Sequence, residues 1–252
     1  MLPEYTQDYL LDKRVKIFQP VNGYRASSDA VLLSAMIDNI KTGARILDVG
    51  SGTGAISLCL AERLQTQNIA IRGAELQSEL AELSNLSAQA NHFDFVRFYN
   101  VDIRQKMQSE DLCPCSFDVV VSNPPYSEHD MPSPNASKAM AHNHHDFNLN
   151  KWLAFCLKMT KPFGRIYIIN RVEALSLICS QLQDKAGGLT ILPIYSKAGQ
   201  NAKRVIVSAQ KDSKAPCRIL PPFITHDADG KYTENAEKIL RQGISFADIF
   251  AT

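Results

Sequence analysis

The stretch LDVGSGTGAIS, Leu47–Ser57, joins a strand-like run to a helix-like run through three closely spaced glycines. The residues that lead into it, Ala44–Gly50, are apolar enough for a buried strand, and Gly54–Gln65 has the apolar spacing of a helix. Glycine allows a tight turn and lets a ligand approach the backbone, and the N-terminus of the following helix adds a favourable field. A strand, a glycine loop and a helix in this order predict a ligand-binding loop at Gly50, Gly52 and Gly54.

Strand-like and helix-like runs alternate along the rest of the chain, as in a parallel sheet with crossover helices. Further strands are expected at Ile69–Glu75, Phe95–Asp102, Phe117–Ser122 and Gly164–Asn170. Helices are expected at Ala30–Asn39, Ser78–Asn91, Phe147–Thr160 and from Val172 to a stop at Gly187-Gly188, with a short strand and a final helix after Lys211. Leu189–Tyr195 and Arg204–Gln210 are too close together for a crossover helix, so we expect an antiparallel pair. The pattern predicts the α/β class.

Length, composition and charge are those of an ordinary globular protein. The chain has 252 residues, 45% of them hydrophobic and 21% charged, with a net charge of +1. Any nucleic-acid surface is therefore expected to be a local basic patch. No apolar run approaches the roughly 18 residues of a membrane span, and the first nine residues lack the apolar core of a secretory signal. The six cysteines are scattered, which favours a cytoplasmic location, and no zinc-site spacing predicts a metal.

Three acidic residues stand at the ends of three successive predicted strands around the glycine loop, namely Asp48, Glu75 and Asp102. Open α/β sheets bind ligands at the carboxyl ends of their strands. Glu75 is placed to accept hydrogen bonds from ribose hydroxyls, and Asp102 to meet an adenine amino group. The loop also fits a dinucleotide fingerprint, so a nicotinamide-dependent oxidoreductase remains an alternative at this point.

With these residues the chain resembles the class I S-adenosylmethionine-dependent methyltransferases over residues 26–210. The run from Asp48 to Gly54 matches the cofactor loop of that family, in which the residue matching Glu75 binds the ribose and the one matching Asp102 reaches the adenine. The resemblance implies S-adenosylmethionine as the cofactor. It also implies a Rossmann-like fold, with a seven-stranded, mostly parallel sheet, an antiparallel last strand and helices on both faces.

The fourth strand runs into Asn123-Pro124-Pro125-Tyr126, which resembles the motif of methyltransferases that modify planar amino groups. An exocyclic amine is a poor nucleophile because its lone pair is delocalised into the ring. The side-chain oxygen of Asn123 and the carbonyl of Pro124 can accept hydrogen bonds from the amine and stabilise the positive charge that develops on nitrogen. Pro125 stiffens the turn, and Tyr126 offers a ring for stacking a flipped-out base. All four are expected to be catalytic, with Asn123 also bordering the cofactor.

Two more segments resemble a narrower family, the bacterial tRNA (adenine-N6) methyltransferases that modify the purine next to the anticodon of a valine tRNA. One is YRASSDAVLL, residues 24–33, and the other is the tail at residues 218–241. The resemblance implies that the first segment closes over the methionine end of the cofactor, with Arg25 and Asp29 as cofactor-binding residues. Asp29 is equally compatible with a plain helix N-cap. The implied substrate is tRNA.

The predicted RNA footprint is a local one. Lys203 and Arg204 are expected to grip phosphates, although ordinary solvated surface explains them equally well. The loop Ser127–Asp146 is long and rich in Pro, Asn, Ser and His, which is typical of a functional or mobile segment. Its three histidines fit a solvated loop better than a metal site.

We therefore expect a single methyltransferase domain, with a cofactor-covering segment at 1–43, a catalytic core at 44–210 and a strand–helix extension at 211–252. The expected reaction is N6-methylation of an adenine in RNA, in first place the anticodon-loop purine of a valine tRNA. A protein glutamine amide and guanine N2 of ribosomal RNA are the alternatives with the same chemistry. An oxidoreductase has no use for Asn123-Pro124-Pro125-Tyr126. No obligate protein partner is expected.

Overall fold

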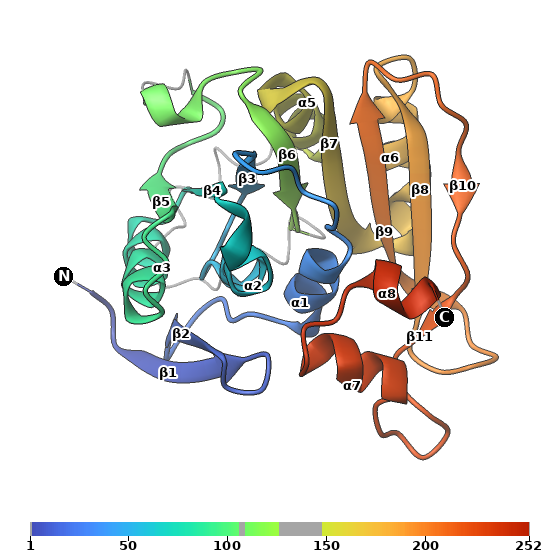
Figure 1. Cartoon of the computed structure of the whole chain (residues 1–252), viewed down its shortest axis with the longest axis horizontal. Coiled ribbons are helices and arrows are strands. Elements are labelled where there is room, and N and C mark those ends of the chain that lie inside the picture. Colours follow the sequence, from blue (N-terminus) through green and yellow to red (C-terminus); the bar gives the residue numbers. More distant parts are fainter. Residues whose placement is uncertain (1, 106–108, 126–147, 252) are drawn as a thin grey trace.

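A large, mostly parallel sheet forms the centre of the computed structural model, which describes residues 2–105, 109–125 and 148–251 (Figure 1). The order of its strands is β10-β8-β9-β7-β6-β3-β4-β5, with β11 also paired to β8. The strands are β3 (Arg45–Val49), β4 (Ala70–Glu75), β5 (Val96–Asn100), β6 (Phe117–Ser122), β7 (Thr160–Arg171), β8 (Ala186–Tyr195), β9 (Ala202–Lys211), β10 (Arg218–Ile219) and β11 (Phe223–Ile224).

The direction of the strands confirms the expected fold. Strands β3 to β7 are parallel to one another, and β9 is antiparallel to both of its neighbours, β7 and β8. The expected antiparallel pair is thus confirmed as β8 and β9. Strands β3 to β9 are the expected seven, and the two-residue strands β10 and β11 extend the edge formed by β8.

Helices cover both faces of the sheet, as expected. They are α1 (Ser28–Ala35), α2 (Ala55–Leu64), α3 (Ser78–Ala90), α5 (Leu149–Met159), α6 (Leu175–Leu182), α7 (Glu234–Leu240) and α8 (Phe246–Phe250), with short 3-10 turns η1 (Gln65–Gln67), η2 (Glu110–Leu112) and η3 (Val172–Ala174). Ile46 faces the core beneath α1 and α2, whereas Leu47 faces the core beneath α5 and α6. Successive strand residues point to opposite faces, so near-continuous apolar strands bury both sides of the sheet. No helix in the described part of the chain is long and apolar enough to cross a membrane.

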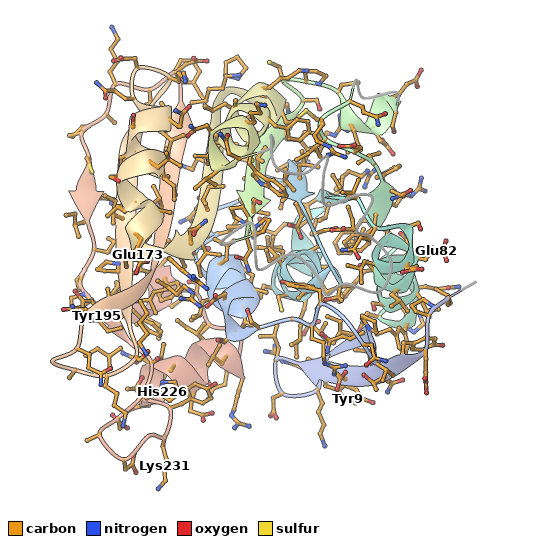
Figure 2. The ribbon with its side chains drawn as sticks, turned by 180° about the vertical axis from the view of Figure 1, so that it is seen from behind. Tyr9, Glu82, Glu173, Tyr195, His226 and Lys231 are labelled. Atoms are coloured by element: carbon orange, nitrogen blue, oxygen red, sulfur yellow. The ribbon has the colours of Figure 1, made fainter. Side chains whose placement is uncertain are left out.

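A two-stranded hairpin, β1 (Tyr5–Leu10) and β2 (Val15–Pro20), lies outside the main sheet and was not signalled by the sequence. Its turn uses non-glycine residues with positive φ at Leu11, Asp12 and Lys13, and β1 exposes polar groups and Tyr9 (Figure 2). The hairpin packs against α3 because the amide of Phe18 donates to Ser87 Oγ at 2.8 Å.

Several element boundaries differ from expectation. Helix α1 ends at Ala35 and not at Asn39, and β5 ends at Asn100, so that Asp102 lies beyond the strand. The predicted helix stop at Gly187-Gly188 is wrong, because α6 ends at Leu182 and β8 begins at Ala186. Gly187 instead allows a close approach between chain segments, since a Cβ there would lie 2.4 Å from the carbonyl oxygen of Ser213. Strand β7 begins at Thr160, directly after α5, and not at Gly164.

The C-terminal segment packs into the same core as α1. Phe223 of β11 and Phe246 of α8 meet edge to face, with ring centroids 4.8 Å apart. Ser245 caps α8 with a reciprocal capping box to Asp248. The turn between β11 and α7 carries His226 and Lys231 (Figure 2), and the ring of His226 lies against that of Tyr232 at 4.7 Å.

Candidate active site

The glycine loop between β3 and α2 is held in a left-handed backbone conformation. Gly50, Gly52 and Gly54 have φ values of 69°, 55° and 80°, a region that L side chains rarely adopt. The amides of Gly50 and Ser51 both donate to the carbonyl of Ala74 in β4, at 2.8 and 3.2 Å. The loop therefore folds back onto the neighbouring strand and turns its outer surface toward the carboxyl edge of the sheet.

Aromatic rings from three distant segments pack directly on these glycines. A Cβ at Gly50 would lie 2.6 Å from the ring of Trp152, and a Cβ at Gly52 would lie 2.7 Å from the ring of Tyr24. At Gly54 the same atom would lie 2.7 Å from Phe98. A residue other than glycine at any of these three positions would have to displace an aromatic ring and also adopt a strained backbone conformation.

Asp48 is a completely buried carboxyl group beneath the loop. Its Oδ2 accepts a hydrogen bond from Ser57 Oγ at 2.8 Å, while Oδ1 has no hydrogen-bond partner among the described residues. Burial raises the pKa of Asp48 to about 7, against the lowering effect of the Ser57 bonds. A cationic group beside this carboxyl would favour its ionised form.

Glu75 holds the loop from the end of β4. Its Oε2 accepts from the amide of Gly52 at 2.8 Å, and its Oε1 accepts from the amide of Gln77 at 2.9 Å. Burial raises the pKa of Glu75, and hydrogen bonds from backbone amides, Gln77 and Gly52 among them, oppose this. The next residue, Leu76, leaves an apolar side chain exposed at the same strand end. A carboxylate followed by an apolar surface suits a ribose joined to a planar base.

Tyr24 is a site residue that the sequence pattern does not single out by itself. Its ring lies on Gly52, and partial burial together with the negative charges of Asp48, Asp29 and Glu75 raises its pKa to about 12. The phenol therefore stays neutral at physiological pH. The sequence feature that could have identified Tyr24 as a site residue is its position within the segment at residues 24–33.

Arg25 and Asp29 hold the segment at residues 24–33 in place. The guanidinium of Arg25 donates to Asp8 Oδ2 at 2.7 Å and to Thr6 and the Pro20 carbonyl, all in the N-terminal hairpin. These bonds support the backbone beside Tyr24, and they do not bring Arg25 to the glycine loop. Asp29 lies in the first turn of α1, where the N-cap position belongs to Ser27. Its carboxylate pairs with Nε of Arg204 at 2.9 Å.

Asp102 follows β5 at the same edge of the sheet, but its carboxylate is engaged locally. Nη2 of Arg104 lies 2.6 Å from Asp102 Oδ2. The hydrogen bonds from Arg104 are the main reason why the pKa of Asp102 lies below its usual value. The predicted contact with an adenine stays a prediction, and Arg104 is a second residue at this position that sequence reasoning missed.

The turn Asn123-Pro124-Pro125 begins where β6 ends, next to the glycine loop. Strands β3 and β6 are parallel neighbours whose last paired positions are Asp48 and Val121, so both turns leave the sheet at the same level. Asn123 is half-buried, Pro124 is buried and Pro125 is exposed. Tyr126 and the loop at residues 127–146 lie outside the described residues.

The first residues of β9 reach this edge because β9 is antiparallel to β7. Arg204 is the register partner of Arg171, the last residue of β7. Arg171 and Lys203 are exposed. The structure thus groups Arg171, Lys203 and Arg204, called the basic edge below, near the strand ends, and Arg171 is a member that the sequence did not indicate.

Three buried polar atoms around the loop lack hydrogen-bond partners among the described residues: Asp48 Oδ1, Ser51 Oγ and Thr53 Oγ1. Buried polar groups in folded proteins are normally paired, so this cluster indicates a polar ligand. Carboxylates at Asp48 and Glu75, an aromatic ring and exposed backbone fit a cationic amino acid joined to a nucleoside. A glycine loop, these acids and a sheet with one antiparallel strand define a class I S-adenosylmethionine-dependent methyltransferase.

Comparison with known proteins gives the same answer. The sequence profile described as a methyltransferase domain matches residues 40–215. A solved structure from Agrobacterium tumefaciens, described as a predicted O-methyltransferase, aligns with a TM-score of 0.70 at 23% identity and covers 86% of this chain and 98% of that one. The chain therefore belongs to the methyltransferase-domain family, and it is an S-adenosylmethionine-dependent methyltransferase.

Curated relatives carry a more specific name. A protein of Haemophilus influenzae (strain PittGG) named tRNA1(Val) (adenine(37)-N6)-methyltransferase is 27% identical over 240 residues, which are 91% of this chain and 95% of the relative. A protein of Porphyromonas gingivalis (strain W83) with the same name is 30% identical over 230 residues, 88% of this chain and 89% of the relative.

Proposed function

We propose that this enzyme transfers a methyl group to the exocyclic N6 of an adenine in tRNA, with the purine next to the anticodon of a valine tRNA as its target. The observation that carries the proposal is the Asn123-Pro124-Pro125 turn, which leaves β6 beside the cofactor loop of β3. The name shared by curated relatives of similar length supports the choice of tRNA.

The turn Asn123-Pro124-Pro125, called the acceptor clamp below, suits an amine because it offers hydrogen-bond acceptors and no strong base. We assign the side-chain oxygen of Asn123 and the carbonyl of Pro124 to the two amine hydrogens. Two hydrogen bonds accepted from the same NH₂ draw the nitrogen out of conjugation and aim its lone pair, and preorganised oxygens stabilise the positive charge that develops there. The proton becomes acidic after transfer and leaves to solvent, so no dedicated base is required.

The residues of the cofactor loop bind and orient. S-adenosylmethionine, when bound, supplies an activated methyl group on a positively charged sulfur. Glu75 is assigned to the ribose hydroxyls, and Asp48 with the neutral phenol of Tyr24 to the positively charged end. Because Glu75 also accepts from the Gly52 amide, ribose and loop backbone would share one carboxylate. Leu76 would lie against the adenine.

The basic edge is the proposed contact for the tRNA backbone. Arg171 ends β7, the neighbour of the strand β6 that leads into the Asn123-Pro124-Pro125 turn, and Lys203 and Arg204 lie at the start of β9 beside it. Phosphate contacts fix the register of a nucleic acid without reading its sequence. Arg204 is already paired with Asp29 of α1, so a phosphate there would adjoin the segment that covers the cofactor.

The direct test is methyl transfer from labelled S-adenosylmethionine. The acceptor is total RNA from a strain that lacks this gene, followed by nucleoside mass analysis, and then a valine tRNA transcript with adenine or guanine next to the anticodon. N6-methyladenosine is expected in the tRNA fraction, and the guanine transcript should stay unlabelled. A parallel reaction offers the protein fraction of the same strain as acceptor. Label in that fraction with none in RNA would overturn the proposal in favour of a glutamine amide, and N2-methylguanosine in ribosomal RNA would overturn the choice of adenine.

Asn123→Ala tests the clamp itself. Transfer should fall about a hundred- to a thousandfold, the effect of removing a key transition-state hydrogen-bond group, while calorimetry should find S-adenosylmethionine bound with nearly unchanged affinity. Asn235→Ala, at an exposed position in α7, is the matched control and should transfer normally. Activity that survives in Asn123→Ala would refute the clamp.

A further inference from the structure

Trp152, the single tryptophan of the chain, lies between the cofactor loop and the acceptor clamp. It belongs to the first turn of α5, and its indole N–H donates to Ser122 Oγ at 2.8 Å. Ser122 is fully buried and immediately precedes Asn123. Its hydroxyl donates in turn to the carbonyl of Val49 at 2.6 Å, and Val49 immediately precedes Gly50.

The same ring also touches the loop directly. A Cβ at Gly50 would lie 2.6 Å from Cζ2 and 2.8 Å from Cη2 of Trp152. The indole thus contacts the first glycine through its six-membered ring and the residue before the clamp through its nitrogen. One rigid side chain bridges both turns.

This bridge lies beyond the reach of the backbone ladder. The register between β3 and β6 ends at Asp48 and Val121, so Gly50 and Asn123 have already left the sheet. The hydrogen bonds from Trp152 to Ser122 and from Ser122 to Val49 join the ends of β6 and β3 beyond their last paired residues. Methyl transfer needs the acceptor nitrogen and the methyl donor held to within a fraction of an ångström, and small displacements cost large factors in rate.

We propose that Trp152 is a positioning residue that sets the spacing between the cofactor loop and the acceptor clamp by acting through Ser122. The inference rests on the clamp role assigned to Asn123 under the proposed function, but not on which macromolecule carries the amine. It predicts that loss of the indole N–H impairs transfer and leaves cofactor affinity intact.

A double-mutant cycle with Trp152→Phe and Ser122→Ala tests the proposal. Trp152→Phe removes the indole N–H and also shortens the ring that reaches Gly50, whereas Ser122→Ala removes the acceptor and leaves the whole indole in place. We expect kcat to fall about tenfold, the kinetic equivalent of one lost hydrogen bond, with the Kd for S-adenosylhomocysteine by calorimetry within about twofold. Because both residues act in one path, Trp152→Phe should add little in the Ser122→Ala background. Tyr99→Phe, which removes a ring hydroxyl bonded to Asp111, is the matched control and should keep kcat.

An effect of Trp152→Phe confined to Kd, or independent multiplication of the two single effects, would overturn the proposal. The kinetic comparison uses whichever acceptor the wild-type enzyme labels, so failure of the adenine assignment is distinguishable from failure of this inference. Fluorescence gives a readout without an acceptor, because all indole emission comes from Trp152. Saturating S-adenosylhomocysteine should shift that emission, and unchanged emission would contradict the contact with the loop.

Discussion

Asp48→Asn should make the cofactor-free enzyme less sensitive to pH. Asp48 is fully buried, and its pKa rises from 3.8 to about 7 in the folded state. At about 1.4 kcal/mol per unit, ionising this group in the native state costs up to about 4 kcal/mol. Because the folded pKa is the higher one, the stabilising effect of the proton is fully present below the unfolded pKa. This stabilisation is lost as the pH rises through the folded pKa of about 7.

The magnitude follows from proton linkage between the two states. Between about pH 5 and about pH 8 the wild-type protein should lose about 2 to 3 kcal/mol of unfolding free energy through this one group. Asparagine keeps the shape of the side chain but does not titrate. The variant should therefore gain that amount relative to wild type over the same interval, whatever constant offset an unpaired amide introduces.

Urea unfolding of both proteins at the two pH values, without cofactor, measures this difference of differences. Groups that titrate alike in both proteins cancel. A relative stability that is the same at both pH values, within about 0.5 kcal/mol, would refute the raised pKa. The same substitution should weaken the binding of S-adenosylmethionine, because the cationic ligand loses a carboxylate. Wild-type affinity should rise with pH through about 7 while that of the variant stays flat.

Two further substitutions test the cofactor loop and its cover. Gly52→Ala should abolish cofactor binding, because the new methyl group meets Tyr24 at 2.7 Å where φ is 55°. The control is Gly230→Ala, where φ is 88° and the space around the glycine is open; it should show only the backbone cost of about 1 to 2 kcal/mol in urea unfolding. Equal cofactor binding in both variants would contradict the packing argument. Arg25→Lys should raise the calorimetric Kd for S-adenosylhomocysteine about two- to fivefold, as expected for the loss of one exposed charge-assisted hydrogen bond, because the hairpin no longer fixes the segment beside Tyr24. Glu234→Gln on α7 is its control, and an unchanged Kd in Arg25→Lys would remove Arg25 from the cofactor site altogether.

Local sequence determined the parts of this protein that depend on local physics. Three glycines between an apolar strand and a helix predict a tight turn, and glycine allows the positive φ values observed there. Apolar runs that alternate with amphipathic ones predict a parallel sheet with crossover helices. The position of Asn123-Pro124-Pro125 after β6 follows from the same pattern.

Only the tertiary structure decided which side chains meet at the site. Trp152 reaches Gly50, Tyr24 reaches Gly52 and Arg204 pairs with Asp29 across long stretches of sequence, and nothing in a periodic pattern specifies such contacts. Arg25 is a further example, because its guanidinium bonds to Asp8 in a hairpin whose turn contains no glycine, while its predicted contact with the cofactor stays a prediction. Gly187 was misread as a helix stop because the crowding from Ser213 that requires glycine arises only once the chain has folded back. Periodicity follows from backbone geometry along one element, whereas contacts between elements depend on how whole surfaces pack.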